Sequence, residues 1–139
     1  MIETVTLASE VPMPREPFVL FDVQRTTLAD RPTLTVRGEL DIATAPELAA
    51  AVDAELAAGS EALIIDLTHT VFMDSSGARE LVRSARQAAA GDVNLYVLAP
   101  NKAGGVRLTI DLLDLGSLVP VVDSVFEITS GVADRRARP

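Results

Sequence analysis

The residues best suited to chemistry form a short polar run, Asp74-Ser75-Ser76, which is followed by Gly77. The run lies between a buried apolar segment and the start of an amphipathic helix, where backbone N–H groups are unpaired and the helix dipole favours negative charge. A plain helix cap at Asp74 or Ser75, with Gly77 easing the turn, would explain part of this pattern. Three small polar residues exceed what one cap requires. An exposed serine hydroxyl here is therefore a candidate phosphate acceptor, because a helix start accommodates an anion.

A second candidate is Asp41, which follows a strand-like run at 33–37 and precedes a predicted helix. Taken alone, this residue is most simply a solvated loop acid. In an α/β sheet, however, the loops that follow parallel strands gather at one end of the sheet. Asp41 and the 74–77 loop are therefore predicted to share a surface.

Nucleophilic catalysis is the main enzymatic alternative. Ser75 or Ser76 would need a histidine base oriented by an acid, and His69 is the single histidine of the chain. No GxSxG nucleophile elbow is present, and an exposed turn histidine explains His69 more simply. A small serine hydrolase is therefore kept only as a remote alternative.

Composition and missing motifs exclude several other classes of site. The chain has 139 residues and no cysteine, which excludes disulfides, thiol nucleophiles and iron–sulfur clusters; with one histidine, a metal site is not expected either. Neither a GxGxxG fingerprint nor a P-loop occurs, so no nucleotide cofactor is expected. A phospho-accepting receiver site would need paired acids near the first strand, but Asp22 has no acidic neighbour. A formal net charge of −8 with 4% aromatic residues argues against direct nucleic-acid binding.

The elements that must position the candidate residues alternate along the chain. Apolar runs predict strands at 18–24, 33–37, 62–67, 94–99 and 118–122. Helices are predicted from Thr44 to Gly59, where Thr44 and Glu47 suggest a capping box, and from the 74–77 loop to Gly91. Two more are predicted, from residue 101 or 102 to 113 and from residue 123 or 124 onwards. This order indicates an α/β domain with a mixed, mostly parallel sheet of four or five strands, whose first pair forms an antiparallel edge.

The domain is predicted to span residues 18–132. Three prolines punctuate residues 1–17 and predict an irregular N-terminal arm, while residues 133–139 carry three arginines and predict a disordered basic tail. No segment is apolar enough for a membrane span, and the N-terminus lacks the pattern of a signal peptide. A soluble, cytoplasmic protein is therefore expected.

Three motifs together resemble the STAS domain of the anti-sigma factor antagonist family. They are RGELDIATAPEL at Arg37–Leu48, LIIDL at Leu63–Leu67 and MDSSG at Met73–Gly77, in the family's order and spacing. The resemblance runs from Phe18 to Thr129. It implies a compact α/β fold and a non-enzymatic role, in which the protein binds an anti-sigma factor and so frees a sigma factor for transcription.

The resemblance also implies a phosphorylation switch. In this family the anti-sigma factor is commonly a serine kinase that phosphorylates the antagonist, and a phosphatase removes the phosphate. The second serine of the motif, Ser76, is the implied acceptor. The implied partner-binding residues surround it: Asp41, Thr44, Asp74, Ser75, Gly77 and Arg79.

One departure from the family pattern bears on which kinase or partner docks. After the DSSG motif the family usually continues with a bulky aliphatic and a small residue, whereas this chain has Ala78-Arg79. No cofactor, metal or membrane is implied. A STAS interaction module that phosphorylation does not control is the alternative within the same fold.

Overall fold

The computed structural model describes residues 20–100 and 104–130, in which strands and helices alternate. The strands are β2 (Asp22–Leu28), β3 (Arg31–Leu40), β4 (Ala62–Asp66), β5 (Thr70–Met73), β6 (Asn94–Leu98) and β7 (Val121–Val122). The helices are α2 (Ala45–Ala57), α3 (Ser75–Ala90), α4 (Gly105–Leu112) and α5 (Val125–Thr129), with a 3-10 turn at Leu115–Ser117. The predicted α/β class is confirmed.

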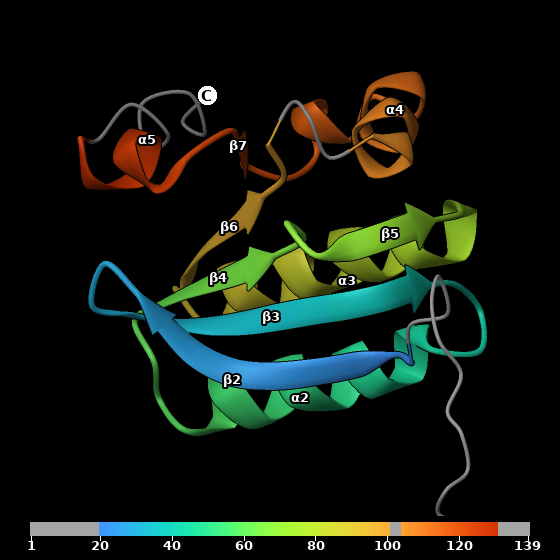
Figure 1. Cartoon of the computed structure of the whole chain (residues 1–139). Coiled ribbons are helices and arrows are strands. Elements are labelled where there is room, and N and C mark those ends of the chain that lie inside the picture. The colour runs from blue at the N-terminus through green and yellow to red at the C-terminus, as the bar shows by residue number, and fades with distance from the viewer. Residues whose placement is uncertain (1–19, 101–103, 131–139) are drawn as a thin grey trace, which may run out of the picture.

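The sheet is mixed and mostly parallel, as predicted. Its strand order is β2-β3-β4-β6-β7, and β5 pairs with β3 off this path (Figure 1). The pair β2–β3 is antiparallel and the other pairs are parallel. The strand β5 was not predicted; this segment was expected to be a loop. Its apolar run, at residues 71–73, is only three residues long and does not alternate with polar residues, so it falls short of the about four to eight residues that predict a strand.

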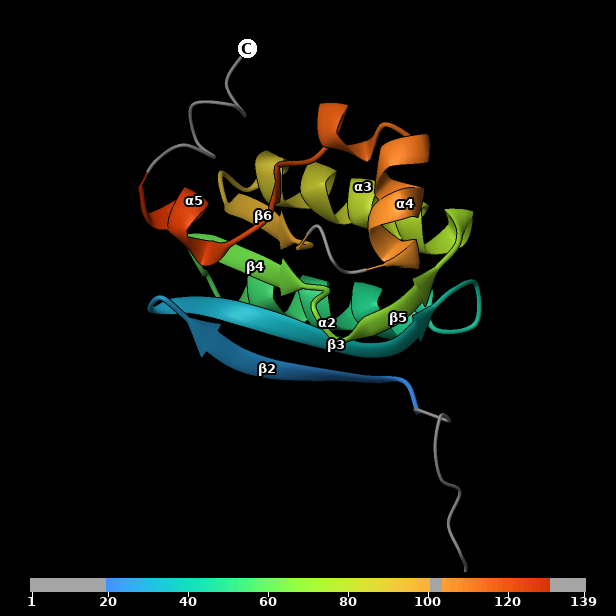
Figure 2. The same ribbon diagram turned by 45° about the horizontal axis from the view of Figure 1, so that its top comes forward.

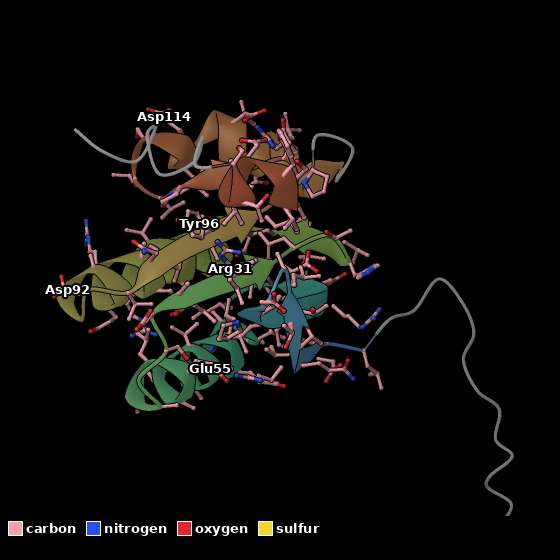
Figure 3. The ribbon with its side chains drawn as sticks, turned by 90° about the vertical axis from the view of Figure 1, so that its left-hand side faces the viewer. Arg31, Glu55, Asp92, Tyr96 and Asp114 are labelled. Carbon is pink, nitrogen blue, oxygen red and sulfur yellow. The ribbon has the colours of Figure 1, made fainter. Side chains whose placement is uncertain are left out.

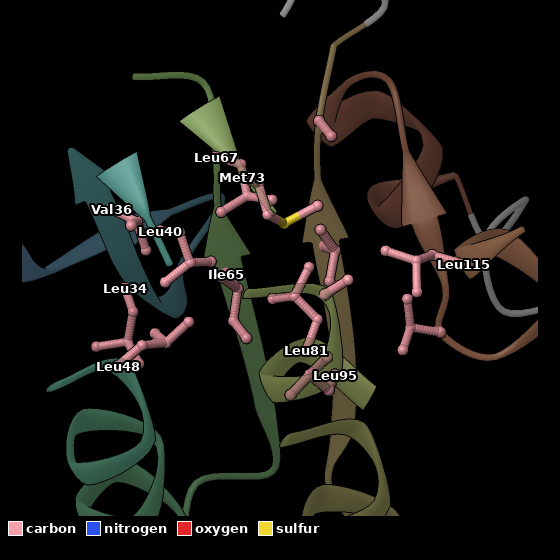
Figure 4. Close-up of a cluster of buried hydrophobic side chains, with 14 of the residues drawn as sticks. Leu34, Val36, Leu40, Leu48, Ile65, Leu67, Met73, Leu81, Leu95 and Leu115 are labelled. Carbon is pink, nitrogen blue, oxygen red and sulfur yellow. The ribbon is translucent and has the colours of Figure 1, made fainter. Parts of the chain in front are cut away.

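Helices cover the sheet on both faces and enclose an aliphatic core. The larger cluster joins α2, α3 and α4 to one face of the sheet; Leu48, Ile65 and Leu81 are fully buried within it (Figures 2 and 4). A smaller cluster on the other face places Ile128 of α5 against Tyr96. Each fully buried leucine stabilises the fold by roughly 1.5–3 kcal/mol. Aliphatic side chains can therefore stabilise this core although the chain has few aromatic residues.

Several predicted boundaries are wrong by a few residues. The polar stretch expected between the first two strands is only a two-residue turn, and Pro32 lies inside β3. Pro32 is paired with Thr27, in the second pair from the turn. The two residues of such a pair exchange no backbone hydrogen bonds, so a proline, which has no N–H group, is tolerated there. The last strand begins at Val121, not Leu118, because the 3-10 turn occupies the preceding segment.

Other predictions lie wholly or partly outside the described residues. These are the arm at 1–17, the strand start at 18–19, the helix start at 101–103, the domain end at 131–132 and the tail at 133–139.

The turn between β2 and β3 contains a strained residue that can be tested. Ala29 and Asp30 have φ of 50° and 64°, the pattern of a type I′ turn, which prefers Asn-Gly. A left-handed alanine is unfavourable by about 1–2 kcal/mol because its Cβ crowds a carbonyl oxygen. We expect the double substitution Ala29→Asn, Asp30→Gly to raise the free energy of unfolding by about 1 kcal/mol, measured by urea denaturation. Unchanged or lower stability would contradict this account of the turn.

The two ends of the parallel strands differ in what they carry. At the N-terminal ends, Arg31 and Tyr96 line a cavity of about 640 Å³ together with the residues of the turn (Figure 3). The Asp74–Gly77 segment lies at the opposite ends of the strands, after the last residue of β5. This cavity is therefore separate from the candidate site.

Candidate functional site

The pairing of β3 with β5 brings the two predicted loops together. These strands run parallel, with Leu40 opposite Met73. The backbone N–H of Asp74 donates a hydrogen bond to the Leu40 carbonyl at 3.3 Å. Asp41 and Asp74 therefore leave the sheet at the same edge, and the predicted shared surface is present.

Asp74 caps helix α3, as the sequence suggested. Its Oδ1 atom accepts hydrogen bonds from the backbone N–H of Ser76 at 2.9 Å and of Gly77 at 3.1 Å. Its backbone is extended, with φ −104° and ψ −170°, as expected of an N-cap. The cap holds the first turn of α3 in place and leaves the hydroxyl groups of the serines for other contacts.

The two serines of the loop differ in exposure. Ser75, the first residue of α3, is exposed, whereas Ser76 is half-buried. Neither serine is buried, so neither is excluded as a phosphate acceptor. The assignment of Ser76, which comes from the family resemblance, stays a prediction.

Gly77 lets the start of α3 pack directly on the end of β3. A Cβ atom at this position would lie 2.5 Å from the Leu40 carbonyl oxygen and 2.8 Å from the Cγ atoms of Leu40 and Met73. Gly77 is also buried. It was expected among the partner-binding residues, but its place beneath the surface means that it acts by positioning its neighbours.

Asp41 and Thr44 build a rigid turn before α2. The Asp41 Oδ1 atom accepts hydrogen bonds from the N–H groups of Ala43 at 3.0 Å and Thr44 at 3.1 Å. The Thr44 hydroxyl donates to the Glu39 carbonyl at 2.7 Å and accepts from the Asp41 N–H at 2.9 Å. The predicted capping box with Glu47 is wrong, because the turn already occupies the Thr44 hydroxyl and no side-chain cap bond forms.

These bonds predict what loss of the Asp41 carboxylate does to stability. Asp41→Ala removes the acceptor for two backbone N–H groups and is expected to lower the free energy of unfolding by about 1 kcal/mol. Asp41→Asn keeps an oxygen at the same position and should lower it by less than half as much. Chemical denaturation of both variants checks this. Equal losses would mean that the charge, not the turn, carries the effect.

Helix α3 is fixed to α2 by a polar network. Arg83 donates to both carboxylate oxygens of Glu80 at 3.0 Å and to Asp53 at 3.2 Å. The Ser84 hydroxyl donates to the same Glu80 carboxylate at 2.8 Å. The hydrogen bond to Glu80 is the main reason that the pKa of Arg83 is raised above its ordinary value. By contrast, Arg79 is exposed on α3 and forms no ion pair with any residue that the structure describes.

The geometry does not support a serine hydrolase. His69 precedes β5 and both serines follow it, so the four residues of the strand, about 13 Å in length, separate base from nucleophile. No hydrogen bond joins His69 to Ser75 or Ser76 in residues 20–100 and 104–130.

Within the same residues, no three acidic or histidine side chains gather to hold a metal ion. No helix of this part of the chain is long and apolar enough to cross a membrane.

Helix α4 is a neighbour of the site that the sequence did not reveal. The Thr109 hydroxyl donates to the Met73 carbonyl at 3.0 Å, one residue before the cap of α3. Val106 and Ile110 of the same helix are buried in the larger core cluster. The apolar spacing of this segment predicts a helix, but nothing in it indicates against which loop the helix packs.

Comparison with protein families supports the resemblance. The STAS domain model matches residues 22–128, which include both loops of the site. No curated protein sequence matches this chain.

Solved structures show the same architecture. An anti-sigma factor antagonist from Mycobacterium paratuberculosis is 26% identical, with a TM-score of 0.69 over 81% of this chain and 94% of that one. A Thermotoga maritima protein classed as an anti-sigma factor antagonist is 21% identical, with a TM-score of 0.68 over 79% and 93% of the two chains. Phosphorylated SpoIIAA, a cell fate determinant of Bacillus, is 22% identical, with a TM-score of 0.52 over 81% and 99%. The last two likenesses concern the fold alone.

Proposed function

This chain belongs to the STAS domain family, and we propose that it acts as an anti-sigma factor antagonist, binding an anti-sigma factor and so releasing a sigma factor for transcription. The antagonist from Mycobacterium paratuberculosis supports this proposal because its likeness extends over most of both chains. The protein would act in the cytoplasm, where sigma factors meet RNA polymerase.

One observation carries the proposal. The β3–β5 pairing places the Asp41 turn and the exposed Ser75 at one edge of the sheet, on backbone held by hydrogen bonds. Ser75 is exposed, and within residues 20–100 and 104–130 no histidine lies beside it, which suits a binding surface better than a catalytic one. Asp41, Thr44, Asp74, Ser75 and Arg79 are the residues proposed to form or support this surface.

Phosphorylation of a serine in this loop is proposed as the switch. The anti-sigma factor itself would be the kinase and would supply the bound ATP, and a phosphatase would restore the unmodified form. The start of α3 tolerates the added charge because the helix dipole favours an anion there by about 0.3–1 kcal/mol. Arg79, four residues after Ser75, lies on the same side of the helix and carries a positive charge.

Binding of purified anti-sigma factors from the source organism tests the proposed function. Titration calorimetry with the full chain should find one that binds at a one-to-one ratio, and Asp41→Asn should weaken that binding while the fold is kept. A folded wild-type protein that binds none of them would refute the proposal. Binding that ATP never reverses would instead favour the interaction module without phosphorylation.

The acceptor is decided by mapping the phosphate. The proposed acceptor is Ser76, and its more exposed neighbour Ser75 is the alternative. With the cognate kinase and ATP, we expect Ser76→Ala to abolish incorporation of phosphate and Ser75→Ala to retain most of it, measured by mass spectrometry of the digested protein. The reverse pattern would overturn Ser76 and establish Ser75 as the acceptor.

A further inference from the structure

Large apolar side chains are exposed around the candidate site. Leu108 and Leu112, four residues apart on α4, are 58% and 75% exposed. Phe72 of β5 is 46% exposed and Ile42 of the β3–α2 turn is 76% exposed. Scattered exposed leucines are ordinary on a protein surface, but a group of them marks an interaction site.

These side chains come from three segments that meet at one edge of the sheet. Phe72 lies opposite Glu39 in the β3–β5 register, and Ile42 follows two residues after the end of that pairing. The bond from Thr109 to the Met73 carbonyl fastens α4 beside β5. Figure 1 shows α4 above the ends of β3 and β5, next to the start of α3. The apolar groups therefore flank the loop that carries Ser75.

The charges near these residues restrict what can cover them. Asp111 and Asp114 are exposed beside Leu112, and Glu39 and Glu47 are exposed beside the Asp41 turn. Arg107, the one basic residue described on α4, is held by Asp111, Asp123 and the Ala99 carbonyl. A second copy of this chain, with its formal net charge of −8, would bring like charges together, and an anionic membrane would be repelled in the same way.

We propose that Leu108 and Leu112 of α4 form, with Phe72 and Ile42, a docking surface for the anti-sigma factor, and that this partner presents apolar side chains within a basic rim. The inference rests on the proposed function, and it adds helix α4 to the two loops of the site, which are the Asp41 turn and the loop at 74–77. Apolar anchors at the centre of an interface carry most of its affinity, while the charged rim chiefly sets the rate and selectivity of association.

A matched pair of variants tests this surface. Leu112→Ser removes an exposed apolar side chain from α4, and Phe126→Ser removes one that is 71% exposed on α5, at the other end of the molecule (Figure 2). Each is titrated with the anti-sigma factor that binds the wild type. We expect Leu112→Ser to weaken binding at least tenfold and Phe126→Ser to change it less than twofold, with circular-dichroism spectra unchanged. Raising the salt concentration should weaken wild-type binding as well.

The outcomes separate the failure of this inference from that of the proposed function. If no anti-sigma factor binds the wild type, both the proposed function and the α4 docking surface are refuted. If one binds the wild type and Leu112→Ser equally well, the α4 surface is overturned and the proposed function stands. A wild-type dimer in sedimentation experiments that Leu112→Ser dissociates would assign the surface to a second copy and overturn the proposal. Affinity that does not change with salt would contradict the basic rim.

Discussion

Replacing Gly77 with alanine is expected to destabilise the domain by roughly 2–3 kcal/mol, because the added methyl group overpacks a site that has no room for it. The added Cβ would lie 2.5 Å from the Leu40 carbonyl oxygen. This oxygen is a backbone atom that already accepts a hydrogen bond from Asp74, so it cannot move without loosening the β3–β5 pairing. The helix start must shift instead, which would disturb the Asp74 cap.

Gly91→Ala is the matched control, because it adds the same methyl group at the other end of α3. Its nearest neighbours would be 3.8 Å away, and φ of Gly91 is −101°, which alanine adopts without strain. We expect this variant to unfold within about 1 kcal/mol of the wild type in urea. Equal midpoints for the two variants would show that the close approach at Gly77 is not what fixes α3.

The same loop shows what could be predicted from sequence and why. The cap at Asp74 and the helix that follows were predictable, because capping and apolar spacing are local properties. The shared edge of Asp41 and Asp74 followed from a general rule of parallel sheets. The cap and the helix depend on residues that are near one another along the chain, and the shared edge depends only on the order and direction of the strands.

Features that depend on tertiary packing could not be predicted. Thr44 has the side chain of a helix cap, but its hydroxyl bonds to the Glu39 carbonyl, a choice set by the path of the turn. The strand β5 owes its existence to pairing with β3, not to its own four residues. Ser75 is exposed and Ser76 is partly buried because of how α3 is rotated about its axis against the sheet. The apolar spacing in the sequence does not define this rotation, or the first residue of the helix, to within one residue.

Phosphorylation is expected to weaken binding of the anti-sigma factor at least a hundredfold while the domain stays folded. A phosphoserine adds roughly −1.5 to −2 charges near neutral pH. At Ser76 these charges would lie two residues from Asp74 and near the surface that also carries Asp41. A partner that covers this surface must remove water from the phosphate, and burial of such a charge without a paired cation costs several kcal/mol.

Two smaller effects act in the opposite direction and do not cancel that cost. The helix dipole favours the phosphate by about 0.3–1 kcal/mol, but it does so in the free protein as well as in the complex. Arg79 can pair with it, yet an ion pair between exposed side chains on one helix contributes only about 0.3–0.5 kcal/mol. The phosphate should therefore block binding by occlusion and by the cost of removing its water, with no unfolding of α3.

Titration calorimetry on the wild type and four altered samples, all folded, tests this mechanism. The phosphorylated protein should bind at least a hundredfold more weakly than the wild type. Ser76→Ala should bind normally and be insensitive to kinase and ATP. Ser76→Asp, with one added charge instead of nearly two, should show a smaller loss than phosphate, and Ser75→Asp applies the same test to the neighbouring serine. Circular dichroism should be the same for all. Wild-type affinity in the phosphorylated sample would refute the switch, and a lost helical signal would show that it acts by unfolding. Occlusion of the interface weakens binding and leaves the circular-dichroism spectrum unchanged, whereas unfolding of α3 would change both. The difference arises because water must be removed from the phosphate only when the partner binds, and not when the domain folds.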